Sequence, residues 1–349
     1  MSQNTLEHPC ADSSRRPVDS SDVILTGDRP TGPLHLGHFA GSLGSRLALQ
    51  GRCPQTLLIA DLQALTDSSG RAADVARHVT EVALDYLAIG IDPAQTTIAV
   101  QSRLGALSEL TMLYLNLVTI ARLERNPTVK AEVLLRGFER SLPAGFLCYP
   151  VSQAADISGF RATLVPVGSD QLPMIEQTNE IVRAVNRLAG TTVLSECRAL
   201  LSTTPRLPGV DGRKASKSAG NAIPLSASSD DIHRMVMSMY TDPGHVRATD
   251  RGRVEGNVVF AYLDAFDPDA GFVNDLKERY RSGGLGDVVV KRRLEEVIEA
   301  FVAPIRARRG ELVGDRAHVT EVLRAGNERA RETTEAVLRD VRRAFALGV

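Results

Sequence analysis

The feature that most constrains this chain is a turn rich in glycine and proline near its N-terminus. Residues 26–41 read TGDRPTGPLHLGHFAG, and they join a short apolar run at 23–25 to a helical pattern. A strand that ends in such a turn and continues as a helix presents backbone N–H groups and the positive end of the helix dipole. The turn therefore predicts a phosphate site at the end of a strand.

Two histidines stand at the start of the predicted helix. His35 and His38 are three residues apart and fall on one side of the first helical turn. Gly37 and Gly41 leave few side chains on that face, so a flat ring or a ribose could approach the backbone closely. We interpret the turn as a nucleotide site. The alternative is a glycine-rich loop whose histidines make ordinary helical contacts.

Strand and helix patterns alternate over much of the chain. Short apolar runs at 23–25, 55–61, 97–101 and 162–167 fit buried strands. Helical spacing follows them, up to Gln50 and over 72–89, 108–124, 149–156 and 171–188. This order predicts an α/β fold, a doubly wound parallel sheet of Rossmann-like type with ligands at the carboxyl ends of its strands.

The pattern changes near residue 226. Beyond it the expected elements are helices at 231–240, 258–266, 272–280, 288–307 and 320–347. This change of pattern predicts a smaller all-helical C-terminal domain.

Two further segments carry polar groups in positions that suit a nucleotide. Asp170 follows a strand and a glycine turn, where it either caps a helix or accepts hydrogen bonds from a ribose. Residues 212–221 read GRKASKSAGN and predict a mobile loop that brings Lys214 and Lys217 to an anion. The alternative for this loop is a solvated basic segment.

Composition and charge exclude little. The chain has 349 residues, 43% of them hydrophobic and 24% charged, and a formal net charge of -1, which makes no global case for binding DNA or RNA. Residues 1–21 lack the apolar core of a signal peptide and predict a disordered tail. No apolar run approaches bilayer length, so we expect a cytoplasmic protein without a membrane partner.

The two motifs together resemble those of class I aminoacyl-tRNA synthetases. These enzymes carry a His-x-Gly-His turn near the N-terminus and a Lys-x-Ser-Lys-Ser loop after the nucleotide fold, as at 35–38 and 214–218 here. Additional segments make the resemblance specific to bacterial-type tryptophanyl-tRNA synthetases. They are GIDP at 90–93, AGFL at 144–147, YP at 149–150, AAD at 154–156 and VPVGSDQ at 165–171. The similarity runs from about residue 22 to the C-terminus.

The resemblance implies a tryptophan pocket. By match to the family, Asp156 accepts the indole N–H, and Tyr149 and Gln171 hold the amino group. The other side chains expected at the pocket are those of Leu25, Gln63 and Gln153.

The resemblance also implies an ATP site with Mg²⁺. The matching residues at ATP are Gly27, Arg29, Gly37, Gly168, Asp170, Lys214, Ser216, Lys217 and Ser218. The residues expected to stabilise charge on the phosphates are His35, His38, Lys130, Lys214 and Lys217. Mg²⁺ would be held by ATP oxygens and water, since the sequence offers no dedicated metal ligands.

Partners and domains follow from the same resemblance. The expected partners are L-tryptophan, ATP, tRNA-Trp and a second copy of the chain. Residues 22–225 would form the catalytic domain, with dimer-interface helices and the lysine loop at 212–221. Residues 226–349 would bind the anticodon side of the tRNA, with the last helix packing back on the catalytic domain.

Several positions depart from the family pattern. Gln153, Gln63 and Leu25 stand where common relatives carry a methionine, a histidine and an aromatic residue, and Ala215 replaces a methionine of the loop. These changes resemble a divergent or auxiliary branch with a more polar pocket edge. The rival hypotheses are a tyrosyl-tRNA synthetase, a small nucleotidyltransferase, and a synthetase-derived regulatory protein with weak tRNA charging.

Overall fold

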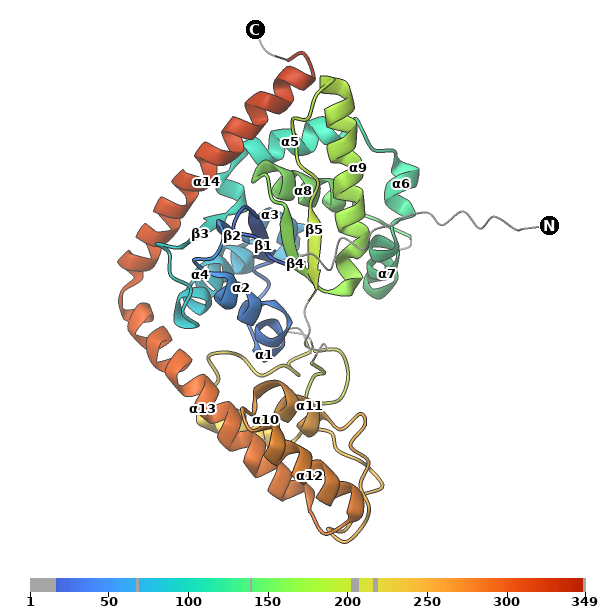
Figure 1. Ribbon diagram of the computed structural model, residues 1–349, viewed down its shortest axis with the longest axis vertical. Helices are drawn as coiled ribbons and strands as arrows, with labels where there is room; N and C mark the ends of the chain where they lie inside the picture. Colours follow the sequence, from blue (N-terminus) through green and yellow to red (C-terminus); the bar gives the residue numbers. More distant parts are fainter. Residues whose placement is uncertain (1–16, 67–68, 139, 202–206, 216–218, 348–349) are drawn as a thin grey trace, which may run out of the picture.

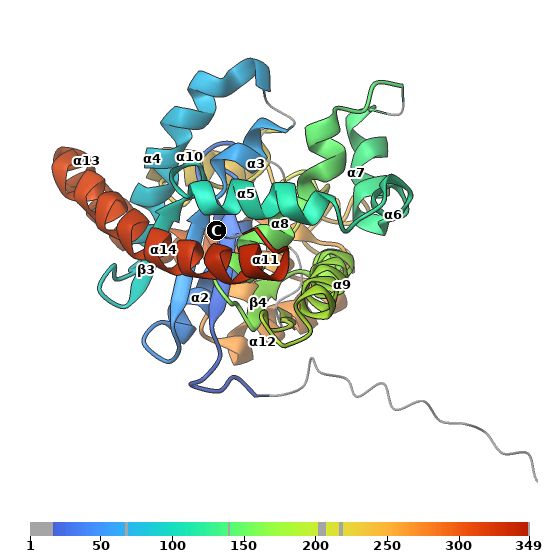
Figure 2. The same ribbon diagram turned by 90° about the horizontal axis from the view of Figure 1, so that it is seen from above.

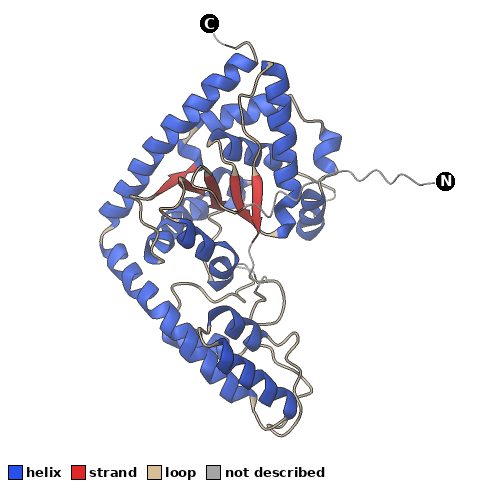
Figure 3. Ribbon diagram, in the orientation of Figure 1, coloured by secondary structure: helices blue, strands red, loops and turns tan. Residues whose placement is uncertain are grey.

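The centre of the protein is a parallel sheet with helices packed around it (Figures 1 and 3). A computed structural model describes residues 17–66, 69–138, 140–201, 207–215 and 219–347. The strands are β1 (Ile24–Asp28), β2 (Gln55–Ile59), β3 (Thr96–Val100), β4 (Leu164–Val167) and β5 (Arg198–Leu201). They lie in the order β3-β2-β1-β4-β5, which confirms the doubly wound α/β fold.

The strand order creates the crevice in which a ligand can bind. β1 pairs in parallel with β2, from Ile24 opposite Gln55 to Asp28 opposite Ile59, and its other edge pairs with β4. After β1 the chain continues to β2, toward one edge of the sheet, and after β4 it continues to β5, toward the opposite edge. In folds of this type, ligands bind at the carboxyl ends of the strands where the order reverses.

β5 was absent from the predicted strands. It contains only four residues, Arg198–Leu201, and its first residue is charged, so the apolar run is too short to stand out from its surroundings. Its place in the sheet comes from a long-range contact, because it pairs in parallel with β4.

The predicted tail at 1–21 needs a correction at its C-terminal end. Residues 1–16 lie outside the described residues, but 17–21 lie against the sheet. Val18 packs on the apolar cluster around Ile24 and Leu164. Just beyond, the buried carboxylate of Asp22 accepts a 2.7 Å hydrogen bond from Arg198 at the start of β5. This contact anchors the chain immediately before β1.

The helices follow the predicted order. They are α1 (Leu36–His38), α2 (Gly44–Leu49), α3 (Asp61–Leu65), α4 (Ala72–Ala88), α5 (Gly105–Leu115), α6 (Ile120–Glu124), α7 (Pro127–Arg136), α8 (Ala144–Gly159), α9 (Leu172–Ala189), α10 (Ser229–Met237), α11 (Val258–Phe266), α12 (Ala270–Ser282), α13 (Asp287–Gly314) and α14 (Arg316–Ala344). None of those described is both long and apolar enough to cross a bilayer.

Two predicted helices are divided. The helix after the first turn contains a π-helical segment, Phe39–Leu43, between α1 and α2. The helix expected at 108–124 is two helices, because the chain leaves the helical path at 116–118 and Thr119 starts a new one. The Thr119 hydroxyl accepts a 3.2 Å hydrogen bond from the backbone N–H of Arg122, which is a helix N-cap.

The C-terminal helices form a lower lobe and a long arm. α10, α11 and α12 lie beside α13 in the lower lobe, and α13 and α14 follow one another along the side of the molecule up to the sheet (Figure 1). Seen from above, α14 runs across the upper lobe close to α5 (Figure 2). The arm therefore joins the helical region to the sheet.

α14 contacts the sheet directly at β3. The side-chain oxygen of Asn327 accepts a 2.8 Å hydrogen bond from the backbone N–H of Val100. Arg329 donates to the carbonyl of Pro93, at 3.0 Å. Gly326 makes this approach possible, because a Cβ atom there would lie 1.9 Å from the carbonyl oxygen of Ile98.

This close approach predicts a large effect of one methyl group. Gly326→Ala should lower the free energy of unfolding by about 1–3 kcal/mol, since the clash is with backbone that cannot rotate away. Gly310→Ala is the matched control: Gly310 lies within α13, and its added Cβ meets nothing within 4 Å. It should stabilise by up to about 1 kcal/mol through helix propensity. Urea denaturation followed by circular dichroism measures both. Equal stability of the two variants would contradict the prediction.

Candidate active site

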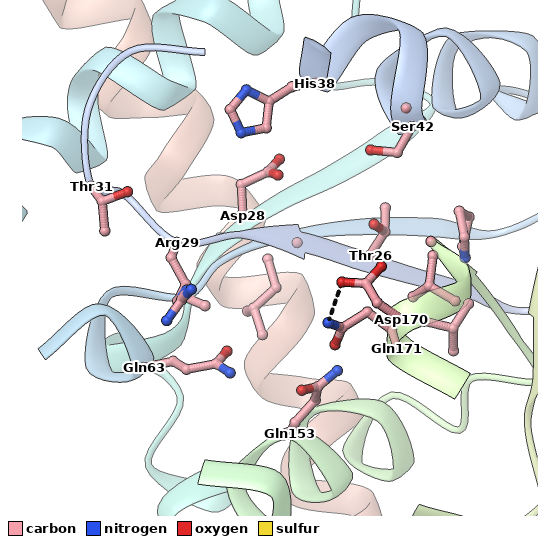
Figure 4. A pocket seen from close by; sticks show the side chains of 18 of the residues that line it. Thr26, Asp28, Arg29, Thr31, His38, Ser42, Gln63, Gln153, Asp170 and Gln171 are labelled. Atoms are coloured by element: carbon pink, nitrogen blue, oxygen red, sulfur yellow. Dashed lines mark hydrogen bonds between the residues drawn. The ribbon is translucent and has the colours of Figure 1, made fainter. Parts of the chain in front are cut away.

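A cavity of about 1270 Å³ opens at the carboxyl ends of β1 and β4. Figure 4 shows its two ends. One end carries the labelled side chains of Thr31, His38 and Ser42. Toward the other end lie Gln63 and Gln153. The cavity therefore extends from the first turn to helix α8.

Most of the site residues expected from the sequence line this cavity. They are Leu25, Gly27, Arg29, His35, Gly37, His38, Gln63, Tyr149, Gln153, Asp156, Gly168, Asp170, Gln171 and Lys214. Ser216, Lys217 and Ser218 lie outside the described residues. The structure thus brings together side chains from segments that are far apart in the sequence.

Backbone pairing joins the two sequence motifs. The N–H of Leu36 donates to the carbonyl of Ile223 at 2.9 Å, and the N–H of Leu225 donates to the carbonyl of Leu34 at 3.0 Å. Ile223 and Leu225 follow the lysine segment closely. This pairing holds the segment against the first turn, and Lys214 consequently reaches the same cavity.

A buried carboxylate fixes the turn from the other side. One oxygen of Asp85, on α4, accepts a 2.8 Å hydrogen bond from the backbone N–H of Leu34. Its other oxygen accepts a 2.7 Å bond from Arg309 on α13. Burial raises the pKa of Asp85, and these two donors act against that rise. The turn, α4 and the C-terminal arm thus meet at one side chain.

Both histidines of the turn line the cavity, and the hydrogen bonding of His38 makes its ring a donor. The backbone N–H of His35 donates to Nδ1 of His38 at 3.2 Å. A neutral imidazole that accepts at Nδ1 carries its proton on Nε2, so His38 presents an N–H donor. The two rings lie with their centroids 3.8 Å apart. An N–H donor is the group that a phosphate oxygen requires.

A buried ion pair, which the sequence did not reveal, lies beneath His38. Arg46 donates to the carboxylate of Asp28 at 2.5 Å, and the hydroxyl of Tyr86 donates to the same carboxylate at 2.6 Å. The Arg46 side chain is 2% exposed. Burial alone would raise the pKa of Asp28, but the charge of Arg46 and the hydrogen bonds from Arg46 and Tyr86 hold it well below its usual value. Asp28 is therefore ionised at neutral pH, close to the first turn.

At the other end of the cavity, a glutamine orients Asp156. Nε2 of Gln101 donates to both carboxylate oxygens of Asp156, at 2.9 and 2.8 Å. Oε1 of Gln101 accepts from the backbone N–H of Gln63 at 3.1 Å. Burial raises the pKa of Asp156 to about 7, against the effect of the Gln101 hydrogen bonds. Asp156 is thus a buried acceptor whose charge changes near neutral pH.

Lys130 is not at the cavity. It is exposed on α7 and lines a separate apolar groove of about 280 Å³ with Val133 and Leu142. Glu132 and Arg136, one helical turn apart, are the α7 residues that line the main cavity. Residue 130 points away because two positions along a helix correspond to a rotation of roughly 200°.

Several lining or supporting residues escaped the sequence reasoning. They are Arg46, Arg71, His78, Gln101, Glu132 and Arg136. The position of Gln101 could have been predicted, because this residue directly follows a buried strand whose carboxyl end faces the site. The others lie on helices or beside them, where the sequence pattern alone does not distinguish a cavity face from a solvent face.

Comparison with known proteins identifies the family. The family model described as tRNA synthetases class I (W and Y) matches residues 20–303. The chain belongs to this family. The fold, the first turn and the cavity at the strand ends agree with the class I synthetase resemblance seen in the sequence.

Relatives of this class I synthetase are similar over nearly their whole length. Tryptophan--tRNA ligase of Clostridium longisporum is 54% identical over 333 residues, which is 94% of this chain and 98% of that protein. The Streptococcus mutans protein of the same name is 50% identical over 336 residues, 94% of this chain and 99% of that protein. The crystal structure of Campylobacter jejuni tryptophanyl-tRNA synthetase with ADP and tryptophan has a TM-score of 0.81 and 28% identity, covering 93% of this chain and 99% of that one.

The buried ion pair of this synthetase generates a stability prediction. Arg46→Met should cost about 3–5 kcal/mol, because the Asp28 carboxylate stays buried without its cation. The double variant Asp28→Asn with Arg46→Met removes both charges and should recover most of that loss. Because the pKa of Asp28 is lowered, the wild-type contribution persists through mildly acidic pH and disappears only in stronger acid.

Urea denaturation of the single and double variants measures this coupling. Arg77→Met is the control, since Arg77 pairs with Asp74 on the surface of α4 and its side chain is 67% exposed. That variant should match the wild type. A double variant no more stable than Arg46→Met would overturn the coupling.

Proposed function

We propose that this chain activates L-tryptophan with ATP and transfers it to the 3′ end of tRNA-Trp. The observation that carries the proposal is the cavity, which combines a donor-rich end at the first turn with an end closed by the buried acceptor Asp156. The near full-length similarity to tryptophan--tRNA ligases supports the same substrate.

The first step is an in-line displacement at phosphorus. A carboxylate oxygen of tryptophan attacks the α-phosphorus of ATP, the bond to the bridging oxygen breaks, and pyrophosphate leaves. Negative charge accumulates on phosphate oxygens, so the protein must supply positioned donors rather than a nucleophile. His35 and His38 donate from the turn, and Lys214 and Lys217 follow the pyrophosphate. Losing one such donor costs on the order of 10²–10³ in rate.

Mg²⁺ enters with ATP as part of the substrate. Among the described residues, no group of three or more His, Cys, Asp or Glu side chains forms a metal site. We expect phosphate oxygens and water to be its ligands, which suits the preference of Mg²⁺ for retaining water. The bound ion would neutralise phosphate charge while the lysines and histidines orient the chain of phosphates.

The second step joins the two parts of the chain. A ribose hydroxyl at the tRNA 3′ end attacks the adenylate carbonyl carbon, and AMP leaves. We assign residues 22–225 to catalysis and 226–349 to the anticodon side of the tRNA. The arm of α13 and α14 connects the two regions, since α13 packs on α10 and α11 and α14 packs on β3 and α5 (Figure 1).

Asp156 accounts for discrimination among aromatic amino acids. A buried acceptor that pairs with an indole N–H is left unpaired by phenylalanine, and that penalty rejects it. Tyrosine brings a hydroxyl donor, so the size of the pocket has to exclude it. The family model covers both the tryptophan and the tyrosine enzymes, which makes tyrosine the competitor to test.

Pyrophosphate exchange and tRNA charging test the proposed function. The protein should support tryptophan-dependent ATP–pyrophosphate exchange and should charge purified tRNA-Trp. Asp156→Ala should reduce the exchange strongly while ATP binding changes little. Exchange with tyrosine instead would transfer the assignment to the tyrosine enzymes. Exchange without charging would favour the auxiliary role that the polar residues Gln63 and Gln153 suggest.

The shifted pKa of Asp156 predicts a pH dependence of tryptophan binding. With a pKa of about 7, the carboxyl is protonated as the pH falls through neutrality and loses the charge that strengthens its hydrogen bond to the indole. Affinity should be about tenfold lower at pH 6 than at pH 8, where the carboxylate form predominates. Calorimetric titration over this range measures it.

An isosteric ligand and an isosteric variant isolate this effect. The benzothiophene analogue of tryptophan has sulfur in place of the indole N–H, so its affinity should hardly change between pH 6 and 8. Asp156→Asn should likewise remove the pH dependence of tryptophan binding. An unchanged pH profile in this variant would assign the titration to another group.

We also propose that the protein is a cytoplasmic homodimer. Helices α5, α6 and α7 carry large apolar side chains that are more than 60% exposed in the single chain. They are Met112, Ile120, Leu134 and Leu135. Exposed apolar groups gathered on neighbouring helices are typical of a protein interface.

Light scattering coupled to size exclusion tests the dimer. The wild type should elute with twice the mass of the chain. Leu135→Glu should produce monomers, because it places a charge in the interface. Val246→Glu changes an apolar residue of the lower lobe that is even more exposed, and it should leave the mass unchanged. Monomeric wild type would refute the proposal.

A further inference from the structure

An amino acid substrate is a zwitterion, and the cavity offers charged groups that could read both of its charges. The family resemblance assigns the amino group to Tyr149 and Gln171, which are both uncharged. Yet Glu132 and Arg29 line the same cavity, and the sequence resemblance gives Glu132 no role. Hydrogen bonds between charged partners are about twice as strong as those between neutral ones.

Glu132 is positioned by the packing of α7. This helix begins with Pro127 after Asn126, whose side chain accepts a 3.0 Å hydrogen bond from the backbone N–H of Thr128. Val129 and Val133 pack with Phe146 and Tyr149 of α8 in one apolar cluster. The neighbouring Glu132 is half-buried and lines the cavity. Its backbone is therefore fixed by helix packing rather than by a loop.

The other acids of the cavity already have defined partners. Asp28 accepts from Arg46 and Tyr86, and Asp156 accepts from Gln101. Asp170 lies in the turn after β4, where it accepts a 3.4 Å hydrogen bond from Gln171.

Glu132 lies next to the hydroxyl of Tyr149. Within the part of the chain that the structure describes, it forms no ion pair with a basic side chain. Arg136, one turn further along the same helix, also lines the cavity. Glu132 therefore brings a carboxylate to the cavity beside Tyr149, where it can compensate a cationic ligand group.

The hydroxyl of Tyr149 locates Glu132 relative to Arg29. Burial raises the pKa of Tyr149, the adjacent Glu132 carboxylate raises it further, and the guanidinium of Arg29 acts in the opposite direction. Both charges therefore lie near the same hydroxyl. In Figure 4, Arg29 lies beside Gln63, between the end of β1 and the region reached by Gln153. An acid and a base thus flank the tyrosine expected at the amino acid.

We propose that Glu132 binds the α-ammonium group of the amino acid and that Arg29 binds its α-carboxylate. This inference rests on the proposed function and adds the charged groups that recognise the substrate backbone. Arg29 directly follows Asp28 and its side chain lies beside Gln63 (Figure 4), so a carboxylate held there lies between the two ends of the cavity. Glu132 acts at binding and takes no part in bond breaking.

Two analogues separate the two charges. Tryptamine keeps the ammonium group and lacks the carboxylate, whereas indole-3-propionate keeps the carboxylate and lacks the ammonium group. The chain contains no tryptophan, so the indole emission of each ligand can be titrated without tryptophan background from the protein. Dissociation constants of L-tryptophan, tryptamine and indole-3-propionate are measured for the full-length wild type and its variants.

Each variant should affect only the ligands that carry its partner charge. Glu132→Gln should weaken tryptophan and tryptamine about tenfold or more and change indole-3-propionate by less than twofold. Arg29→Gln should weaken tryptophan and indole-3-propionate and spare tryptamine. Equal losses for all three ligands, or unchanged discrimination between tryptophan and indole-3-propionate, would overturn the proposal.

Controls separate this inference from the proposed function and from misfolding. Glu124→Gln makes the same chemical change beside the apolar groove, outside the main cavity, and should bind all three ligands as the wild type does. Thermal unfolding of Glu132→Gln should match the wild type, because a glutamine fills the same volume. If wild-type protein binds no tryptophan, the proposed function fails. If the wild type binds tryptophan but the variants leave the relative affinities for the three ligands unchanged, only the roles of Glu132 and Arg29 fail.

Discussion

The pairing of the first turn with residues 223–225 is the constraint on which the site depends. It is made of backbone hydrogen bonds from Leu36 to Ile223 and from Leu225 to Leu34, so it does not require particular side chains. Asp85 holds the same turn from below and connects it to Arg309 of the C-terminal arm. Without these contacts, the donors of the turn and of the lysine segment would belong to separate surfaces.

The two ends of the cavity differ in the charge of their buried carboxylates. The phosphate end combines the histidine donors with an anion, Asp28, that Arg46 neutralises. The end at which we propose the indole binds carries Asp156. Gln101 orients its carboxylate, and burial raises its pKa to about 7. One buried carboxylate thus stays ionised at all ordinary pH values, and the other changes its charge near pH 7, because a cation lies beside the first and an uncharged amide beside the second.

Local sequence patterns predicted the parallel sheet and the first turn, and the family resemblance supplied most of the other residues that line the cavity. Apolar runs mark β1 to β4, and the glycine-rich turn marks the phosphate end. β5 and the break before Thr119 could not be predicted, since long-range pairing and a single cap decide them. Lys130 matches the family motif, but its position on α7 places it beside the separate apolar groove and not at the main cavity. The roles of Arg46 and Glu132 could not be predicted, because tertiary packing decides whether a helical side chain is buried or faces the cavity, and no local pattern encodes that packing.

The contact between α14 and β3 affects folding during synthesis of the chain. Val100 and Asn327 are 227 residues apart, so the edge of β3 has no cover until the ribosome has released almost the whole chain. An uncovered strand edge is a template for pairing with other chains. Nascent or truncated forms that lack α14 therefore expose a surface prone to aggregation, and contacts at such separation form late in folding. The exposed edge of β3 is covered only when α14 has been synthesised and packs against it.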